Sequence, residues 1–275
     1  MPRYRILLEY DGAAFSGWQL QPGHRTVQEE LERAIGVFAR EPARVAGAGR
    51  PDAGVHALGQ VAAFDLAAPP DLPRAFRAFN GILPKDCRVL SIAEAPAGFD
   101  PRRAATGKTY RYRILNRPAP PAVRRGFVLH YPWRLDAVAM VRAAAAFKGT
   151  HDFGAFRAAD CEAAHAVRHV HHCRVTRNEE MVVVEVTATA FVKNMVRIMV
   201  GTLIEIGNGR RPEGSIAEAL ESRDRAAAGV TAPPQGLFLA QVYYAEEGGA
   251  PAPGLEWPSY APGQGGGEPA DGAAP

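Results

Sequence analysis

Residues 44–66, RVAGAGRPDAGVHALGQVAAFDL, have the pattern of two strands joined by a glycine-punctuated turn. The turn sets the carboxylate of Asp52 close to the guanidinium of Arg50. Because reactive side chains concentrate on loops that a rigid sheet holds in place, Asp52 is a candidate catalytic residue. Asp also caps turns with its own side chain, and residue type alone leaves both roles open.

The glycines of this turn also resemble the start of a dinucleotide-binding fingerprint. Gly47 and Gly49 would be its first two glycines, but the third would fall at Asp52. A carboxylate at that position would repel a pyrophosphate. The spacing therefore gives little support to a dinucleotide cofactor.

The composition is that of a folded protein with a basic body. The chain has 275 residues, of which 47% are hydrophobic, enough for a packed core in one large or two ordinary domains. The net charge is +3, but residues 246–275 contain five acidic residues and no Lys or Arg, so the rest of the chain carries 32 basic and 24 acidic residues. That surplus suits a polyanionic partner, although by itself it is a weak indication.

The cysteines and the apolar segments indicate a compartment. Cys87, Cys161 and Cys173 are odd in number and widely spaced, which is not a disulfide framework. No apolar run reaches the length of a membrane span, and the N-terminus lacks the apolar core of a signal peptide. We therefore expect a protein of the reducing cytoplasm that does not bind a membrane.

Periodicity and turn signals predict an α+β fold in which each half mixes strands with helices packed on one face. Thr26 and Glu29 form a capping box that predicts a helix start. Further helices are predicted at 71–80, 136–148, 191–206 and 215–222, and strands at 3–10, 43–48, 60–66, 87–94, 108–115, 168–177, 181–190 and 236–244.

A proline-rich stretch at 118–121 is the best candidate for a boundary between two domains. We therefore expect an N-terminal half at 1–116 that carries the Asp52 loop and a C-terminal half at 117–245. Residues 246–275 are mostly Gly, Pro and Ala with scattered acids, too poor in apolar bulk to offset the entropy of ordering. They are predicted to be a disordered tail.

Two segments combine aromatic with polar or basic residues. On a strand through 107–113, Lys108, Tyr110 and Tyr112 would share one face, and Arg111 with Arg113 the other. Such a strand can stack bases and neutralise phosphates, but a solvated antiparallel strand has a similar sequence. Near the N-terminus, the aromatic and amide residues of 10–21 could bind nucleic acid or fill a core.

The most apolar segment, FVKNMVRIMVGTLIEIG from Phe191, contains Arg197 among large aliphatic residues. A guanidinium on such a helix either extends to water or is paired. If Arg197 is buried it needs an anionic partner, for which Asp52 is a candidate. Lys193 is predicted one turn earlier on the same face of the helix.

A cluster of potential metal ligands offers a competing hypothesis, a zinc-dependent hydrolase. On a strand, His169, His171 and Cys173 would share a face. The spacing matches no standard zinc site, and neutral His on an exposed hairpin needs no ligand role. We therefore expect no metal, although the cluster includes Cys161, His165, His169, His171, His172 and Cys173.

Six motifs occur in an order that closely resembles the bacterial tRNA pseudouridine synthase A family. They are YDGxxFxGWQxQ, TVQExLExA, GRxDAGVHAxGQVAxF, KTYRYRIL, AFVxxMVRxxVGTLIEIG and GLFL, and the match runs from about Tyr4 to Tyr244. The resemblance implies an isomerase that converts uridines 38, 39 and 40 in the anticodon arm of tRNA to pseudouridine without a cofactor. It further implies a homodimer of the pseudouridine synthase fold, with two pseudo-symmetric halves, a mixed and mainly antiparallel sheet flanked by helices, and a central catalytic cleft.

The resemblance also assigns site residues. It places the catalytic aspartate on Asp52 and the base-stacking tyrosine on Tyr110. Arg197 matches the basic residue that pairs with the aspartate, and Arg50 the arginine that holds the target nucleotide out of the stack. A cation beside a carboxylate lowers its pKa, so Arg197 is expected to keep Asp52 ionised.

The chain departs from the family pattern at two places. Pro51 stands where the family usually has Thr, and proline removes a backbone donor and restricts the preceding residue. A catalytically impaired tRNA-binding protein is therefore the alternative function. Residues 99–103, FDPRR, also differ from the usual FHARxSA, although Arg102 keeps the basic position.

Overall fold

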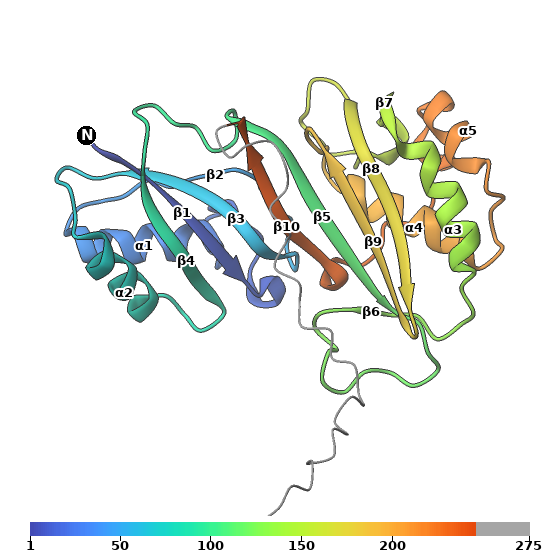
Figure 1. Ribbon diagram of the computed structural model, residues 1–275, viewed down its shortest axis with the longest axis horizontal. Coiled ribbons are helices and arrows are strands. Elements are labelled where there is room, and N and C mark those ends of the chain that lie inside the picture. Colours follow the sequence, from blue (N-terminus) through green and yellow to red (C-terminus); the bar gives the residue numbers. More distant parts are fainter. Residues whose placement is uncertain (246–275) are drawn as a thin grey trace, which may run out of the picture.

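The computed structural model describes residues 1–245, so the tail predicted at 246–275 lies outside the described residues. One ten-stranded sheet runs through the molecule, and its main path has the order β4-β1-β3-β10-β5-β9-β8-β7. Helices pack in two groups, one near each end of the sheet (Figure 1). Most neighbouring strands are antiparallel, which confirms the predicted α+β class with a mixed, mainly antiparallel sheet.

The first half builds one group of helices on strands of alternating burial. In β1 every second residue is buried, as expected for a strand with one face on a core. The Thr26 hydroxyl accepts a hydrogen bond from the Glu29 N–H and caps α1, and Asp71 caps α2 in the same way. The elements are β1 (Arg3–Tyr10), α1 (Val27–Ala39), β2 (Ala46–Gly47), β3 (His56–Asp65), α2 (Leu72–Ile82) and β4 (Cys87–Ala95).

The second half packs its helices on a long hairpin. Strands β8 and β9 pair in antiparallel fashion, and β9 pairs in turn with β5. The elements are β5 (Ala105–Leu115), β6 (Leu129–His130), α3 (Ala137–Ala144), β7 (Gly149–Asp152), β8 (Val167–Asn178), β9 (Met181–Ala188), α4 (Met195–Gly207), α5 (Ser215–Ser222) and β10 (Leu237–Tyr244), with 3-10 turns at 145–147, 154–156, 225–227 and 234–236. A further 3-10 turn, at 12–14, follows β1 in the first half.

The two halves meet at β10, which lies between β3 and β5 (Figure 1). It pairs with β3 in parallel and with β5 in antiparallel fashion. Two hydrophobic cores lie on either side of this junction, and Tyr110 of β5 packs against both. The junction therefore brings residues that are far apart in the sequence into one region. The domain division near 116 stays a prediction.

Several predicted boundaries are wrong in ways that matter for the site. The helix predicted from 191 begins only at Met195, because Asn194 has a left-handed backbone (φ 62°) that a helix cannot pass through. The strand predicted at 60–66 already begins at His56, directly after the Asp52 turn, and that predicted at 43–48 is only Ala46–Gly47. The helix predicted at 136–148 is α-helical to Ala144 and ends in a 3-10 turn.

Within residues 1–245, no helix combines the length and the hydropathy that a membrane-crossing helix requires.

Candidate active site

A cleft of about 850 Å³ lies where the two halves meet. Its wall includes the turn between β2 and β3, the middle of β5 and the residues that lead into α4. Four residues singled out in the sequence line it together: Arg50, Asp52, Tyr110 and Arg197. The structure thus brings three distant segments of the sequence to one cavity.

The start of the Asp52 turn is fixed by a buried glutamine that the sequence did not single out. Gln60, on β3, is fully buried. Its side-chain amide donates to the Gly49 carbonyl at 3.0 Å, and its carbonyl oxygen accepts from the Gly49 N–H at 3.3 Å. Two hydrogen bonds to one residue fix both the position and the orientation of the backbone that leads into Arg50 and Asp52.

The middle of the turn is held by the aromatic segment near the N-terminus. The Trp18 N–H donates to the Pro51 carbonyl at 3.0 Å, and Gly17 (φ 95°) lies so close that an added Cβ would be 2.9 Å from that oxygen. Phe15 and Trp18 are 3% and 2% exposed. The aromatic rings of this segment therefore pack in the core and its backbone supports the Asp52 turn; Trp18, Gln19 and Gln21 also line the cleft, so the role in binding nucleic acid stays a prediction.

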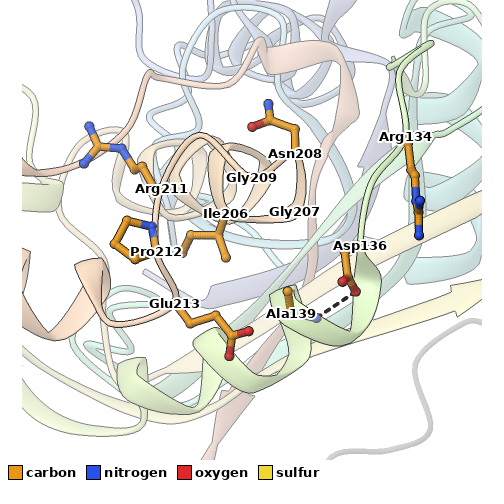
Figure 2. A pocket seen from close by; sticks show the side chains of 10 residues that line it. All are labelled: Arg134, Asp136, Ala139, Ile206, Gly207, Asn208, Gly209, Arg211, Pro212 and Glu213. Carbon is orange, nitrogen blue, oxygen red and sulfur yellow. Dashed lines mark hydrogen bonds between the residues drawn. The ribbon is translucent and has the colours of Figure 1, made fainter.

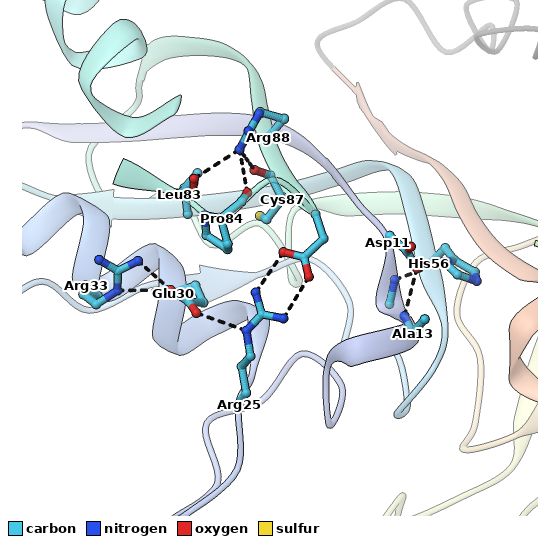
Figure 3. A network of polar contacts seen from close by, with 12 residues as sticks. Asp11, Ala13, Arg25, Glu30, Arg33, His56, Leu83, Pro84, Cys87 and Arg88 are labelled. Atoms are coloured by element: carbon cyan, nitrogen blue, oxygen red, sulfur yellow. Dashed lines mark hydrogen bonds and ion pairs between the residues drawn. The ribbon is translucent and has the colours of Figure 1, made fainter. Parts of the chain in front are cut away.

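The end of the turn contacts the loop that follows β1. The Gly12 N–H donates to Nδ1 of His56 at 3.0 Å, and a Cβ on Gly12 would lie 2.0 Å from the Val55 carbonyl oxygen. Asp11 lies beside the same imidazole at 3.0 Å (Figure 3). Burial lowers the pKa of His56 and the Asp11 charge opposes this, so the neutral ring that accepts from Gly12 is favoured at neutral pH.

A second polar network ties this support to the rest of the N-terminal half. Arg25 donates two hydrogen bonds of 2.8 Å to the Asp86 carboxylate and a third of 3.2 Å to Glu30 (Figure 3). These bonds join the segment before α1 to the turn before β4. The 10–26 segment that supports Asp52 is thereby anchored at both of its ends.

Asp52 itself is partly withdrawn from solvent, with 29% of its side chain exposed. Its Oδ2 lies 3.9 Å from Nη1 of Arg197, with which it forms an ion pair. Burial raises the pKa of Asp52, and the charges of Arg197 and Lys193 oppose that rise. Arg197 therefore lowers this pKa as expected, but burial has the larger effect and the net shift is upward.

Arg197 is fixed in place by neutral acceptors. Its Nε donates to the Ala232 carbonyl at 2.7 Å and its Nη1 to Oδ1 of Asn194 at 2.8 Å. The buried helix α4 thus presents a guanidinium of fixed orientation to the cleft. Lys193 does not lie on the same helix face as predicted, because it precedes α4 and pairs with Asp160 at 2.6 Å.

Tyr110 lies on β5 with its ring edge-on to Phe191, at a centroid distance of 4.9 Å. Burial, and then the charge of Asp52, raises its pKa, so the hydroxyl keeps its proton at neutral pH. The structure confirms that the strand has two different faces. Lys108 and Tyr110 lie on one face and line the cleft. On the other face Arg111 pairs with Glu185 at 2.6 Å, and the Arg113 guanidinium lies 4.6 Å from the Phe238 ring centre.

The histidines of the Cys/His cluster have protein partners. His169 bonds to the Thr150 hydroxyl at 2.8 Å, and Nε2 of His172 lies 3.0 Å from the Thr187 hydroxyl. Over residues 1–245, no group of three or more His, Cys, Asp or Glu side chains is arranged to hold a metal ion.

A smaller hollow of about 470 Å³ lies where α3 begins and α4 ends (Figure 2). Three of its charged groups already serve the fold. Asp136 caps α3 through the Ala139 N–H, Arg211 pairs with Glu205, and Glu213 pairs with Arg142. The cleft at Asp52, which contains a half-buried carboxylate, is therefore the candidate active site.

Comparison with known proteins gives consistent matches. Residues 143–245 match the family described as tRNA pseudouridine synthase. The tRNA pseudouridine synthase A of Methylobacterium nodulans is 47% identical over 247 residues, covering 90% of this chain and 97% of that protein. Those of Myxococcus xanthus and Geotalea uraniireducens are 46% and 42% identical, covering 92% and 89% of this chain and 96% and 100% of their own lengths.

Proposed function

The chain belongs to the tRNA pseudouridine synthase A family, and from this premise we propose that it isomerises uridines 38, 39 and 40 in the anticodon stem and loop of tRNAs. The observation that carries the proposal is the cleft that places Asp52, Tyr110 and Arg197 together in a chain with such relatives. The enzyme is an isomerase that acts within one nucleotide.

The reaction breaks the bond between C1′ of the ribose and N1 of uracil, turns the base and rejoins it through C5. A proton leaves C5, one returns to N1, and no other atom is gained or lost. A carboxylate can act in this sequence as a nucleophile or as a base. Asp52 is the ionisable acid of the cleft that contacts Arg197, and we assign this role to it.

The neighbouring residues suit an extruded nucleotide. The ring of Tyr110 can stack on the uracil, and its protonated hydroxyl can exchange a proton with the base. Arg50 is exposed on the rim of the cleft, where its guanidinium can hold the target nucleotide out of the helical stack. Arg197 offsets the negative charge of Asp52.

Incubation with an unmodified tRNA transcript tests the proposal directly. We expect pseudouridine at positions 38, 39 or 40 wherever the transcript has uridine, with no added metal or cofactor. The matched substrate has cytidine at all three positions and should give no product. Pseudouridine only outside the anticodon arm, or none from folded protein and several tRNAs, would refute the proposed function.

The alternative, an impaired tRNA-binding protein, rests on Pro51 alone. In the structure Pro51 is buried, and its carbonyl oxygen accepts the Trp18 N–H, a bond that any residue can make. We therefore expect Pro51→Thr to change kcat by less than about threefold and to lower the free energy of unfolding by about 0.4–1 kcal/mol, because proline restricts the unfolded chain. Single-turnover rates and urea unfolding of both proteins measure this; a gain of 100-fold or more would favour the impaired-enzyme alternative.

We also infer that the enzyme acts as a homodimer in the cytoplasm. Large apolar side chains are exposed on α3 and on the segment before it, where Trp133 and Val138 are 67% and 62% exposed. Such side chains commonly mark an interface. Sedimentation should give about twice the chain mass of 29.5 kDa, and a monomer at micromolar concentration would contradict the dimer. Cell fractionation tests the compartment.

A further inference from the structure

Three basic side chains line the active cleft away from Arg197: Arg102, Lys108 and Arg168. Lys108 is 8% exposed, and no group within residues 1–245 forms a hydrogen bond or ion pair with its ammonium. It lies two residues before Tyr110 on β5, so both side chains point to the same face of the sheet. A buried, unpaired ammonium is rare, because removal from water disfavours the charge.

The charges around Lys108 do not compensate for its burial. Burial, together with the smaller effect of the nearby Arg102 guanidinium, lowers the pKa of Lys108 to about 8. Burial also lowers the pKa of Arg168; Cys161 opposes this effect and the charge of Arg102 adds to it. Arg102 therefore couples electrostatically to both of the other cations.

Arg168, at the start of β8, is held by hydrogen bonds to neighbouring residues of the chain. Its Nη1 donates to the carbonyls of Val167 at 2.7 Å and His165 at 3.1 Å, and lies 3.3 Å from the His165 ring nitrogen. Its Nε is buried and has no hydrogen-bond partner among the described residues. The fold thus holds the guanidinium still, and its Nη2 also forms no hydrogen bond with the described residues.

The acids of the cleft are engaged elsewhere or exposed. Asp52 lies against Arg197, and Asp160 pairs with Lys193 at 2.6 Å. Glu162 also lines the cleft but is exposed to solvent. No acidic side chain that lines the cleft within residues 1–245 is therefore paired with Arg102, Lys108 or Arg168. A ligand with a compact negative charge would provide the missing counter-ion.

We propose that Arg102, Lys108 and Arg168 form a subsite that binds one backbone phosphate of the substrate RNA beside the target uridine. The inference rests on the proposed function, because that function brings an RNA strand into the cleft. Two residues along a strand span about 7 Å. A base stacked on Tyr110 would therefore leave a phosphate of its own or the adjoining nucleotide close to Lys108.

Phosphate chemistry fits the three donors. A phosphodiester oxygen accepts hydrogen bonds from an ammonium and from guanidinium N–H groups, and such charge-assisted bonds are stronger than neutral ones. The subsite differs from a general basic surface because Lys108 is buried and hydrogen bonds hold Arg168 in place. It should therefore recognise one particular linkage of the RNA.

The first test is Lys108→Gln, compared with Lys85→Gln, which alters an exposed lysine in the turn between α2 and β4. We expect Lys108→Gln to raise KM for tRNA about 10- to 100-fold with a smaller effect on kcat. The salt dependence of log KM should fall by about one unit of slope. Lys85→Gln should change neither quantity. A loss confined to kcat, with KM unchanged, would overturn the subsite.

The second test locates the phosphate. In anticodon stem–loop RNAs, each linkage near the target uridine is replaced in turn by a neutral methylphosphonate. For the wild-type protein, one linkage should weaken binding about 10-fold or more, and in Lys108→Gln that same replacement should cost less than about twofold. If each replacement weakens RNA binding equally in the wild type and in Lys108→Gln, the Lys108 ammonium and the phosphate charge act independently. That result would refute the proposal.

Two further measurements test whether Arg102 belongs to the subsite and whether its ligand is a phosphodiester. Arg102→Gln alters an exposed side chain, cannot disturb the core, and should show partial coupling to the same linkage. Inorganic phosphate should compete with the RNA only weakly if the diester is the ligand, and strong competition would assign the subsite to free phosphate instead.

If the wild-type protein forms pseudouridine but no linkage couples to Lys108, the subsite proposal is refuted while the proposed function stands. If no pseudouridine forms, the function fails, and RNA binding still tests the subsite.

Discussion

Asp52→Asn is expected to lower the rate of pseudouridine formation by at least about 10⁴-fold while leaving the Kd for tRNA within about threefold. The amide has nearly the same size, so the contact with Arg197 and the turn fixed by Gln60 keep their geometry. It cannot act as a nucleophile or base toward the ribose or the uracil. The effect should therefore appear in kcat and not in binding.

Single-turnover rates and filter binding with the same tRNA separate these two quantities. Asp160→Asn is the matched control, because Asp160 is the other aspartate of the cleft, is 73% exposed and pairs with Lys193. We expect it to lower the rate less than 10-fold. If Asp52→Asn retains more than a tenth of the wild-type rate, the carboxylate is not the reacting group.

The sequence predicts most of the elements and the composition of the site, because these depend on local patterns. The capping box at Thr26, the hairpin of β8 and β9, and the strand faces around Tyr110 all follow from periodicity and turn chemistry. The position of β10 between β3 and β5 does not, since pairing between distant strands leaves no local pattern. The proximity of Asp52 to Arg197 followed from no local pattern, and was predicted from charge and from the family resemblance.

The sequence did not reveal the residues that support the Asp52 turn. Gln60 looks like an ordinary polar residue of a strand, and only its burial with two bonds to Gly49 shows its role. The aromatic segment at 10–21 has a composition equally suited to binding and to packing. The start of α4 was misplaced because Phe191 and Val192 continue the helical pattern, whereas the left-handed backbone of Asn194 leaves no trace in periodicity. Asn is nonetheless among the residues that tolerate this conformation.

Arg197→Met should shift the acidic limb of the pH profile of kcat/KM to higher pH. Burial already raises the pKa of Asp52, and the charge of Arg197 is the largest influence that opposes this rise. Without it the pKa of Asp52 rises further, so a larger fraction of the carboxylate is protonated at any pH on that limb. Because the reaction needs the ionised form, activity is lost first at low pH and regained as the pH rises.

At neutral pH we expect kcat/KM to fall about 10²–10³-fold, more than protonation alone explains, because Asp52 also loses the cation that orients it. Arg197→Lys separates the two contributions. A lysine retains a positive charge but cannot reproduce both bonds of the guanidinium, to Ala232 and to Asn194. The acidic limb should then stay close to that of the wild type while the plateau falls. Rate profiles from pH 4 to 9 for the wild type and the two variants test this. If the acidic limb does not move in Arg197→Met, Arg197 orients the carboxylate of Asp52 without changing its pKa. If the limb moves to lower pH, Arg197 does not pair with Asp52.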